Sequence, residues 1–265
     1  MILFLNLFII FVFGTIIGSF LNVVVYRYNT SLSIVTGKSQ CFSCGRGLEW
    51  YELLPLFSYL LLGGKCLGCN SKISSQYFTV ELLTGIVFSA LFLKFGLTPL
   101  LPLYLIIASL FIVMSVYDLK HKIIPDGMVF TFIAFSILMF FIAHPISEII
   151  VFPISLDLLA GPILFAFFAF FWLVSGGKWM GFGDAKLALG VGFLLGFSGG
   201  VYAIMLAFWI GALVSLLIML LQKVKISKYR LSLKSEVPFA PFIILAVLIQ
   251  LITSWNLHNI INFLS

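Results

Sequence analysis

The sequence predicts an all-α polytopic membrane protein of about eight transmembrane helices. Three observations predict this class. Apolar residues make up 62% of the 265 residues and charged residues only 9%, with a mean hydropathy of +1.22. Apolar stretches of spanning length recur along the chain. Basic residues gather in alternate connecting loops, as expected for loops on one side of a membrane.

The spanning segments are expected at 2–25, 78–97, 101–117, 127–143, 156–175, 186–198, 200–221 and 237–252. The first is interpreted as a retained helix, because it lacks a basic n-region and is too long for a cleavable signal peptide. The chain then divides into a first helix (1–25), a loop (26–77) and a seven-helix region (78–265).

The basic residues predict the orientation. Every Lys and Arg except Lys94 lies in the loops 26–77, 118–126, 176–186 and 222–236. These loops alternate along the chain, and loops rich in Lys and Arg stay in the cytoplasm. We therefore expect a multi-pass protein of the plasma (inner) membrane, in contact with membrane lipid and with both termini outside. The net charge of +6 follows from these loops, and nucleic acid is not an expected partner.

Four cysteines form two Cys-x-x-Cys pairs in the first loop, with 21 residues between the pairs; they are Cys41, Cys44, Cys66 and Cys69. Such pairs suit tetrahedral thiolate coordination of zinc. Disulfides fit a cytoplasmic loop poorly, and a redox pair is a further option. Four cysteine ligands leave no open position, so the zinc would be structural. Gly45 and Gly68 are expected in the tight turns. The apolar segment 48–60 predicts a short helix on the membrane surface or a lid.

Two acidic motifs stand in this charge-poor sequence. Asp118 opens the run 118–126, and Asp184 follows Gly181 and Gly183. In the predicted topology both acids lie at helix ends on the cytoplasmic face, at the same depth. A pair of carboxyls there could act as one ionised base that activates water and one protonated acid. The pattern favours aspartyl hydrolysis, although ordinary loop acids would give the same spacing.

Neighbouring residues have supporting roles in this hypothesis. Gly181 and Gly183 would let an extended substrate backbone approach Asp184. Lys186 either offsets the acidic charge or anchors its helix at the interface. Asp126 is a rival partner for Asp184, and it is equally placed to cap the next helix.

Other functions fit less well. The sequence contains no His-Glu-x-x-His motif, no Gly-x-Ser-x-Gly elbow and no Walker-type loop. A small transporter with acids at the membrane midplane remains an alternative, as does a presenilin-like intramembrane GxGD protease. Acids at one membrane face weigh against the transporter, and the cysteine loop weighs against the presenilin type.

In order along the chain, the motifs resemble those of the bacterial type IV prepilin peptidases, membrane aspartic peptidases that process pilins and pseudopilins. The matching segments are Gly18–Val24, Cys41–Cys69, Val80–Gly85, Asp118–Asp126, Gly181–Asp184 and Pro238–Phe242. The sequence departs from common family residues at Phe42, Gln76, Phe78 and Ala240.

The resemblance implies that Asp118 and Asp184 are the catalytic pair, with Asp126 and Glu81 in supporting positions. It also implies that a prepilin or pseudopilin precursor is the partner and that its basic leader is cut at the cytoplasmic face. A second implied activity is N-methylation of the new N-terminus with S-adenosylmethionine. That activity is associated with family members that keep the cysteine-bearing loop, here 26–77.

Overall fold

The computed structural model describes residues 2–144, 154–223 and 238–254. Regular structure in these ranges is helical apart from two isolated β-bridges, Gln40 with Gly47 and Lys65 with Lys72, so the predicted all-α class is confirmed. Six of these helices are long and apolar enough to cross a membrane, and a further apolar helix is shorter. Most of the predicted loop 222–236 and the C-terminal end lie outside the described residues.

The helices follow the predicted spans closely. They are α1 (Ile2–Arg27), α3 (Gln76–Phe95), α4 (Leu101–His121), α5 (Asp126–Ala143), α6 (Ile154–Ser175), α7 (Phe182–Lys223) and α8 (Ala240–Thr253). Two short helices, η1 (Trp50–Leu53) and α2 (Phe57–Leu61), lie in the first loop. Because α4 continues beyond 117 and α7 begins before 186, Asp118 lies in a last helical turn and Asp184 in a first one.

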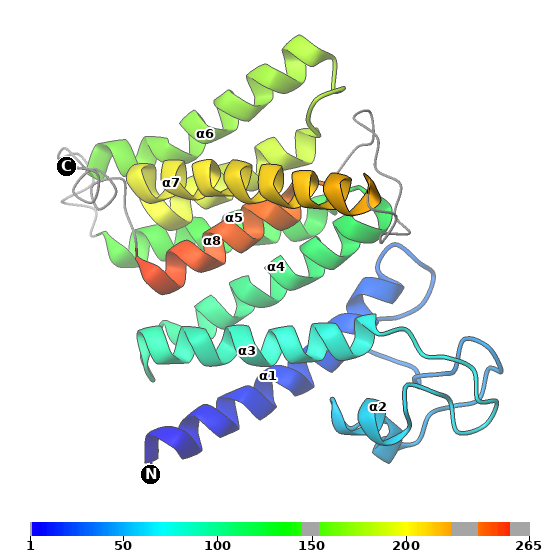
Figure 1. Ribbon diagram of the computed structural model, residues 1–265. Helices are drawn as coiled ribbons and strands as arrows, with labels where there is room; N and C mark the ends of the chain where they lie inside the picture. The colour runs from blue at the N-terminus through cyan, green and yellow to red at the C-terminus, as the bar shows by residue number, and fades with distance from the viewer. Residues whose placement is uncertain (1, 145–153, 224–237, 255–265) are drawn as a thin grey trace. The chain divides into compact units, whose positions relative to one another are not determined.

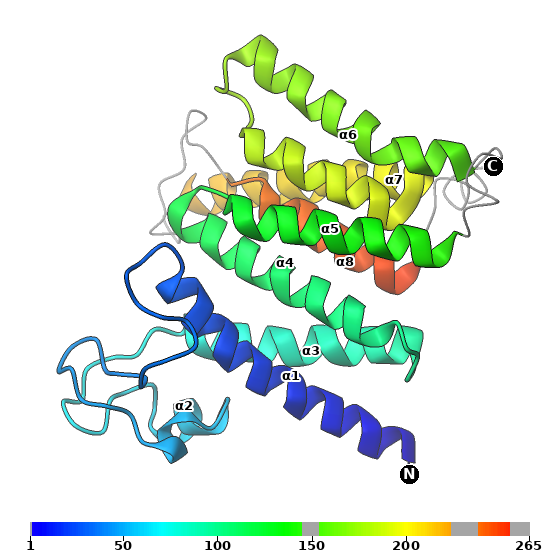
Figure 2. The same cartoon turned by 180° about the vertical axis from the view of Figure 1, so that it is seen from behind.

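A break inside α7 accounts for the two helices predicted there. Gly196 has φ +69° and ψ −175°, a conformation that glycine adopts without a steric penalty. The chain then turns back, since a Cβ on Gly200 would lie 3.6 Å from the Gly192 Cα; Figures 1 and 2 show the two halves side by side. Asp157 of α6 accepts a hydrogen bond from the Phe197 N–H at 2.7 Å, which caps the second half. The break therefore falls at 196, slightly before the predicted position.

The chain forms two compact units, Met1–Val113 and Met114–Ser265. In the first unit α1 packs along α3 (Figure 1). A Cβ on Gly14 would lie 2.8 Å from the Gly85 Cα, and one on Gly18 would lie 2.7 Å from the Glu81 Cα. Only glycine permits so close a crossing. The crossing brings the motif at Gly18 against the motif Val80–Gly85.

In the second unit, α5, α6 and α8 each pack against α7 (Figure 2). The α7 residues Leu187, Ala188 and Val191 are completely buried, so this helix forms the core of the unit. Its first turn carries Asp184, and its burial fixes the position of that turn relative to α5.

Candidate functional site

Asp118 and Asp184 are buried acids of the second unit, with 5% and 6% of their surface exposed. They lie near enough for the charge of Asp118 to act on Asp184. One stands in the last turn of α4 and the other in the first turn of α7. Buried carboxyls are costly without compensating partners, so a pair of them in one unit is a feature of functional sites.

Asp118 has a backbone partner that the sequence analysis did not identify. The N–H of Ala240, the first residue of α8, donates a hydrogen bond to the Asp118 carboxylate. The first N–H groups of a helix have no partner within the helix, and its N-terminus favours negative charge. The motif Pro238–Phe242 therefore starts α8 beside the first acid. Pro241, at a position typical of a first helical turn, was the available signal.

Asp184 is bonded to its own motif. The Gly181 N–H donates to Asp184 Oδ2 at 3.2 Å, and the Asp184 N–H donates to the Gly181 carbonyl at 3.1 Å. Gly183 faces a neighbour, because a Cβ there would lie 3.1 Å from the Cβ of Ile124. In this structure the space beside Gly183 is filled by Ile124, so a role in admitting substrate stays a prediction.

The hydrogen-bond partner of Asp126 is a lysine, whereas that of Asp118 is the backbone N–H of Ala240. It accepts a hydrogen bond from the Lys186 ammonium at 2.7 Å, and that ammonium also lies 5.2 Å from the ring centroid of Phe182. Asp126 is the first residue of α5, and its predicted capping position is taken by Pro125. Of the two roles considered for Lys186, the contact supports charge compensation, directed at Asp126.

The four cysteines meet in the first unit. Their sulfur atoms all lie within 4.8 Å of one another, and the Cys41 and Cys69 sulfurs are 3.8 Å apart. Tetrahedral zinc with Zn–S bonds of about 2.3 Å requires sulfur atoms about 3.8 Å apart. The donor set and spacing therefore fit a four-coordinate thiolate metal site.

The two Cys-x-x-Cys turns have the same backbone design. In each, the N–H of the first cysteine donates to a carbonyl five residues later, at 2.9 Å and 3.0 Å. The fourth residue after that cysteine is left-handed: Gly45 has φ +69° and Asn70 has φ +56°. Gly68 lies in the second turn, as expected, although the left-handed residue of that turn is Asn70. A small residue is needed at Gly68 because it leaves room for Arg46, whose Nε would lie 3.0 Å from a Cβ there.

Local hydrogen bonds favour the thiolate form at Cys41 and Cys69. The backbone N–H groups of Cys44 and Ser43 lower the pKa of Cys41 to about 6. The Ser71 hydroxyl and backbone lower the pKa of Cys69. The Arg46 N–H lowers the pKa of Cys44, but the neighbouring thiols outweigh it and raise that pKa to about 11. Such a spread is expected when several thiols share one site, and a bound cation would favour thiolate at every position.

An ion pair between Arg46 and Glu52 contacts the cysteine cluster. Arg46 donates to Glu52 at 2.6 Å, and its guanidinium also acts on Cys66. The backbone N–H of Glu49 and then the Arg46 guanidinium hold the pKa of Glu52 below its usual value. Arg46 therefore offsets negative charge that four thiolates would bring.

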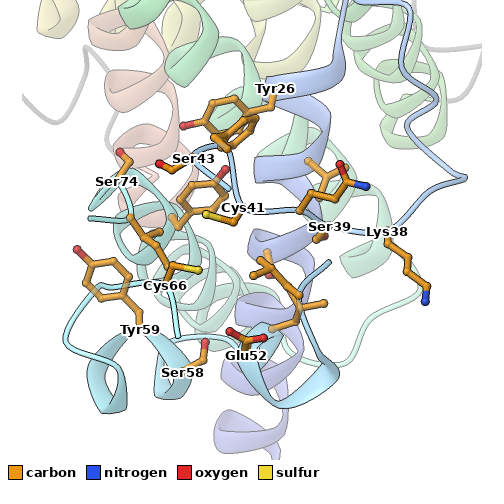
Figure 3. A pocket seen from close by; sticks show the side chains of 18 of the residues that line it. Tyr26, Lys38, Ser39, Cys41, Ser43, Glu52, Ser58, Tyr59, Cys66 and Ser74 are labelled. Atoms are coloured by element: carbon orange, nitrogen blue, oxygen red, sulfur yellow. The ribbon is translucent and has the colours of Figure 1, made fainter. Parts of the chain in front are cut away.

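A cavity of about 760 Å³ opens beside this cluster, between α1, α3 and the first loop. Figure 3 shows Cys41 and Cys66 in its wall, together with Tyr26, Glu52 and Tyr59. The cavity was not predictable from the sequence, because its lining comes from separate segments between Ser19 and Glu81.

Glu81 reaches the cavity from α3 and is only 7% exposed. It accepts a hydrogen bond from the Leu56 N–H at 2.8 Å and contacts the Ser19 hydroxyl. Leu56 has φ +62°, a conformation that is unfavourable for a leucine. Glu81 thereby holds the start of α2 against α3.

Comparisons with known proteins bear on both units. A family model for the bacterial peptidase A24 N-terminal domain matches residues 12–95, and a model for the type IV leader peptidase family matches residues 105–216. A prepilin leader peptidase/N-methyltransferase of Bacillus subtilis is 32% identical over 89% of this chain and 89% of its own length. The chain belongs to the type IV leader peptidase family.

Further relatives in the family carry the same description. A protein of Pseudomonas aeruginosa is 28% identical over 90% of this chain and 87% of its own length. One of Myxococcus xanthus is 45% identical, over 45% of this chain and 36% of its own length. No solved structure matches the chain significantly. In this member of the type IV leader peptidase family, the match at 105–216 contains Asp118 and Asp184, and the match at 12–95 contains the cysteines and the cavity.

Proposed function

We propose that the chain is a membrane aspartic endopeptidase that removes the leader from type IV prepilin-like precursors, with Asp118 and Asp184 as the catalytic pair. The observation that carries the proposal is the approach of these two buried carboxyls from separate helices. Family membership supports the substrate class, because the relatives are named prepilin leader peptidase/N-methyltransferase.

The chemistry follows from a carboxyl pair that shares one proton. The ionised carboxyl takes a proton from water as the water oxygen attacks the scissile carbonyl, and the protonated carboxyl donates to the carbonyl oxygen. The C–N bond then breaks, and the departing amine takes up a proton. Hydrogen bonds from Gly181 and Ala240 hold the two acids in place.

Mass spectrometry of a purified pilin precursor, incubated with the protein in membranes, tests this activity. Loss of the leader at the boundary of the apolar segment is the expected result. Moving the cleavage site ten residues into the apolar helix lowers it by about 15 Å. Cleavage of that deep site would point instead to a presenilin-like protease, and no cleavage of either substrate would contradict the proposal.

A second activity is proposed for the first unit, namely N-methylation of the newly exposed N-terminus. S-adenosylmethionine supplies a methyl group carried on sulfur. As the N–CH₃ bond forms, the S–CH₃ bond breaks, the sulfur keeps the electron pair, and the amine loses a proton. The names of the relatives support this activity. The carboxyl pair lies in the second unit and the cavity lies in the first. The cavity is therefore the candidate site of the second reaction.

Two further proposals concern the setting of the sites. The four cysteines would hold one structural zinc ion, supported by sulfur spacings that match tetrahedral geometry. The basic loops support a cytoplasmic position for the cysteine loop and both acids, and termini outside. Accessibility of single introduced cysteines to a membrane-impermeant reagent, in sealed cells and in inverted vesicles, tests this orientation.

A further inference from the structure

We propose that the cavity of the first unit is the site of the sulfonium methyl donor, with the positive sulfur placed against Tyr26, Tyr77 and Glu81. The inference rests on the proposed N-methylation and adds its binding site. S-adenosylmethionine is a cation at sulfur and carries an adenosine group, a carboxylate and an amine. A site for it must therefore attract a soft positive charge and also accommodate polar groups.

The size and position of the cavity suit such a ligand. Its volume of about 760 Å³ lies within the range of about 300–1,000 Å³ for small-molecule sites. Its lining residues all lie between Ser19 and Glu81, so the first unit supplies the whole site. Figure 3 shows the hydroxyls of Ser39, Ser43, Ser58 and Ser74 around the cavity, which match the hydrogen-bonding groups of a nucleoside.

Three aromatic rings belong to the lining of the cavity. The rings of Tyr26 and Tyr77 stack with centroids 5.3 Å apart and planes inclined by 13°. Phe42 lies against the same ring of Tyr26, at 5.3 Å between centroids. All three residues line the cavity. Ring faces attract a cation within about 6 Å of the centroid, and a sulfonium has few hydration contacts to lose.

Glu81 adds carboxyl oxygen acceptors to this site. Its known partners are the Leu56 N–H and the Ser19 hydroxyl, whereas a carboxylate has about four acceptor positions. It can therefore face a cation without giving up the bond that holds Leu56.

The basic residues of the cavity do not oppose this arrangement. The Arg27 guanidinium donates to three backbone carbonyls, those of Ser33, Thr36 and Lys38, so it is engaged in ordering the loop. Lys38 and Lys72 also line the cavity, and their ammonium groups suit the donor's carboxylate.

The test compares two ligands that differ in charge at sulfur. Equilibrium dialysis of the purified full-length protein measures binding of S-adenosylmethionine and of the neutral thioether S-adenosylhomocysteine. We expect Tyr26→Leu and Glu81→Gln each to weaken the first by about tenfold and the second by less than about twofold. Glu81→Gln keeps an acceptor for the Leu56 N–H, so the cavity keeps its shape.

Tyr104→Leu is the matched control, because Tyr104 stacks on Phe95 at 4.0 Å in the same unit and does not line the cavity. It should bind both ligands as the unaltered protein does. An equal loss for both ligands in Tyr26→Leu and Glu81→Gln would overturn the sulfonium site, as would unchanged binding. If the unaltered protein cleaves a precursor but neither binds the donor nor methylates, the second proposed activity fails. If it methylates normally in both variants, only this assignment of the site fails.

Discussion

Lys186 donates a hydrogen bond to Asp126 at 2.7 Å and so joins the N-terminal part of α7 to the first turn of α5. This contact separates the two acids that the sequence offered as partners for Asp184. Asp126 lies at an exposed position, with 62% of its side chain accessible, and is paired with Lys186. Asp118 is buried and acts on Asp184. The four predictions below follow from this arrangement and from the cysteine loop.

Replacing either buried acid should abolish leader cleavage. Asp118→Asn and Asp184→Asn keep the size of the side chain but cannot exchange the proton that hydrolysis needs. We expect losses of about 10²- to 10⁴-fold, measured as the rate of precursor cleavage by mass spectrometry. Asp157→Asn is the control, since Asp157 caps Phe197 in the same unit. Cleavage at an ordinary rate by either dyad variant, at normal expression, would exclude the pair.

Breaking the ion pair should weaken cleavage without abolishing it. Asp126→Asn and Lys186→Met each remove one partner of an exposed contact, which contributes about 0.2–1 kcal/mol. The cleavage rate should fall by less than about fivefold, and the double variant should be no worse than the poorer single one. Complete inactivity of Asp126→Asn beside an active Asp118→Asn would instead make Asp126 the catalytic partner.

A side chain at Gly183 should disturb the second acid through Ile124. Gly183→Val would press against Ile124, since even a Cβ would lie 3.1 Å from it, and overpacking of this kind costs about 1–3 kcal/mol. Thermal stability and cleavage should both fall, and adding Ile124→Ala should restore part of each. Gly47→Ala, whose Cβ meets no atom within 4 Å, should have no effect. Failure of the second substitution to restore stability would contradict the contact.

Purified protein should contain about one zinc ion per chain, because four thiolates complete a tetrahedral site. Cys66→Ser, which replaces the buried cysteine of the cluster, should lower the zinc content and expose the first loop to proteolysis. Metal analysis by mass spectrometry gives the stoichiometry. Leu67→Ala changes an exposed residue of the same turn and should keep the metal. Full loop order in a metal-free protein would refute a structural metal.

The fold class, the approximate spans, the cysteine pairs and both acids could be predicted from the sequence. These features depend on local composition and spacing: a spanning helix needs a continuous apolar run, and thiolate ligands come in short fixed intervals. The break in α7 was predictable for the same reason, although its position at Gly196 required the observed backbone angles.

Only the tertiary structure decided which side chains meet. Asp118 reaches Ala240, Asp126 reaches Lys186, and Glu81 holds Leu56. Each pair joins residues on different elements, and its geometry depends on how those elements pack. The cavity was undetectable for the same reason, because its walls come from α1, α3 and the loop together. Composition and periodicity determine which segments form helices, whereas side-chain packing between them determines which groups share a site.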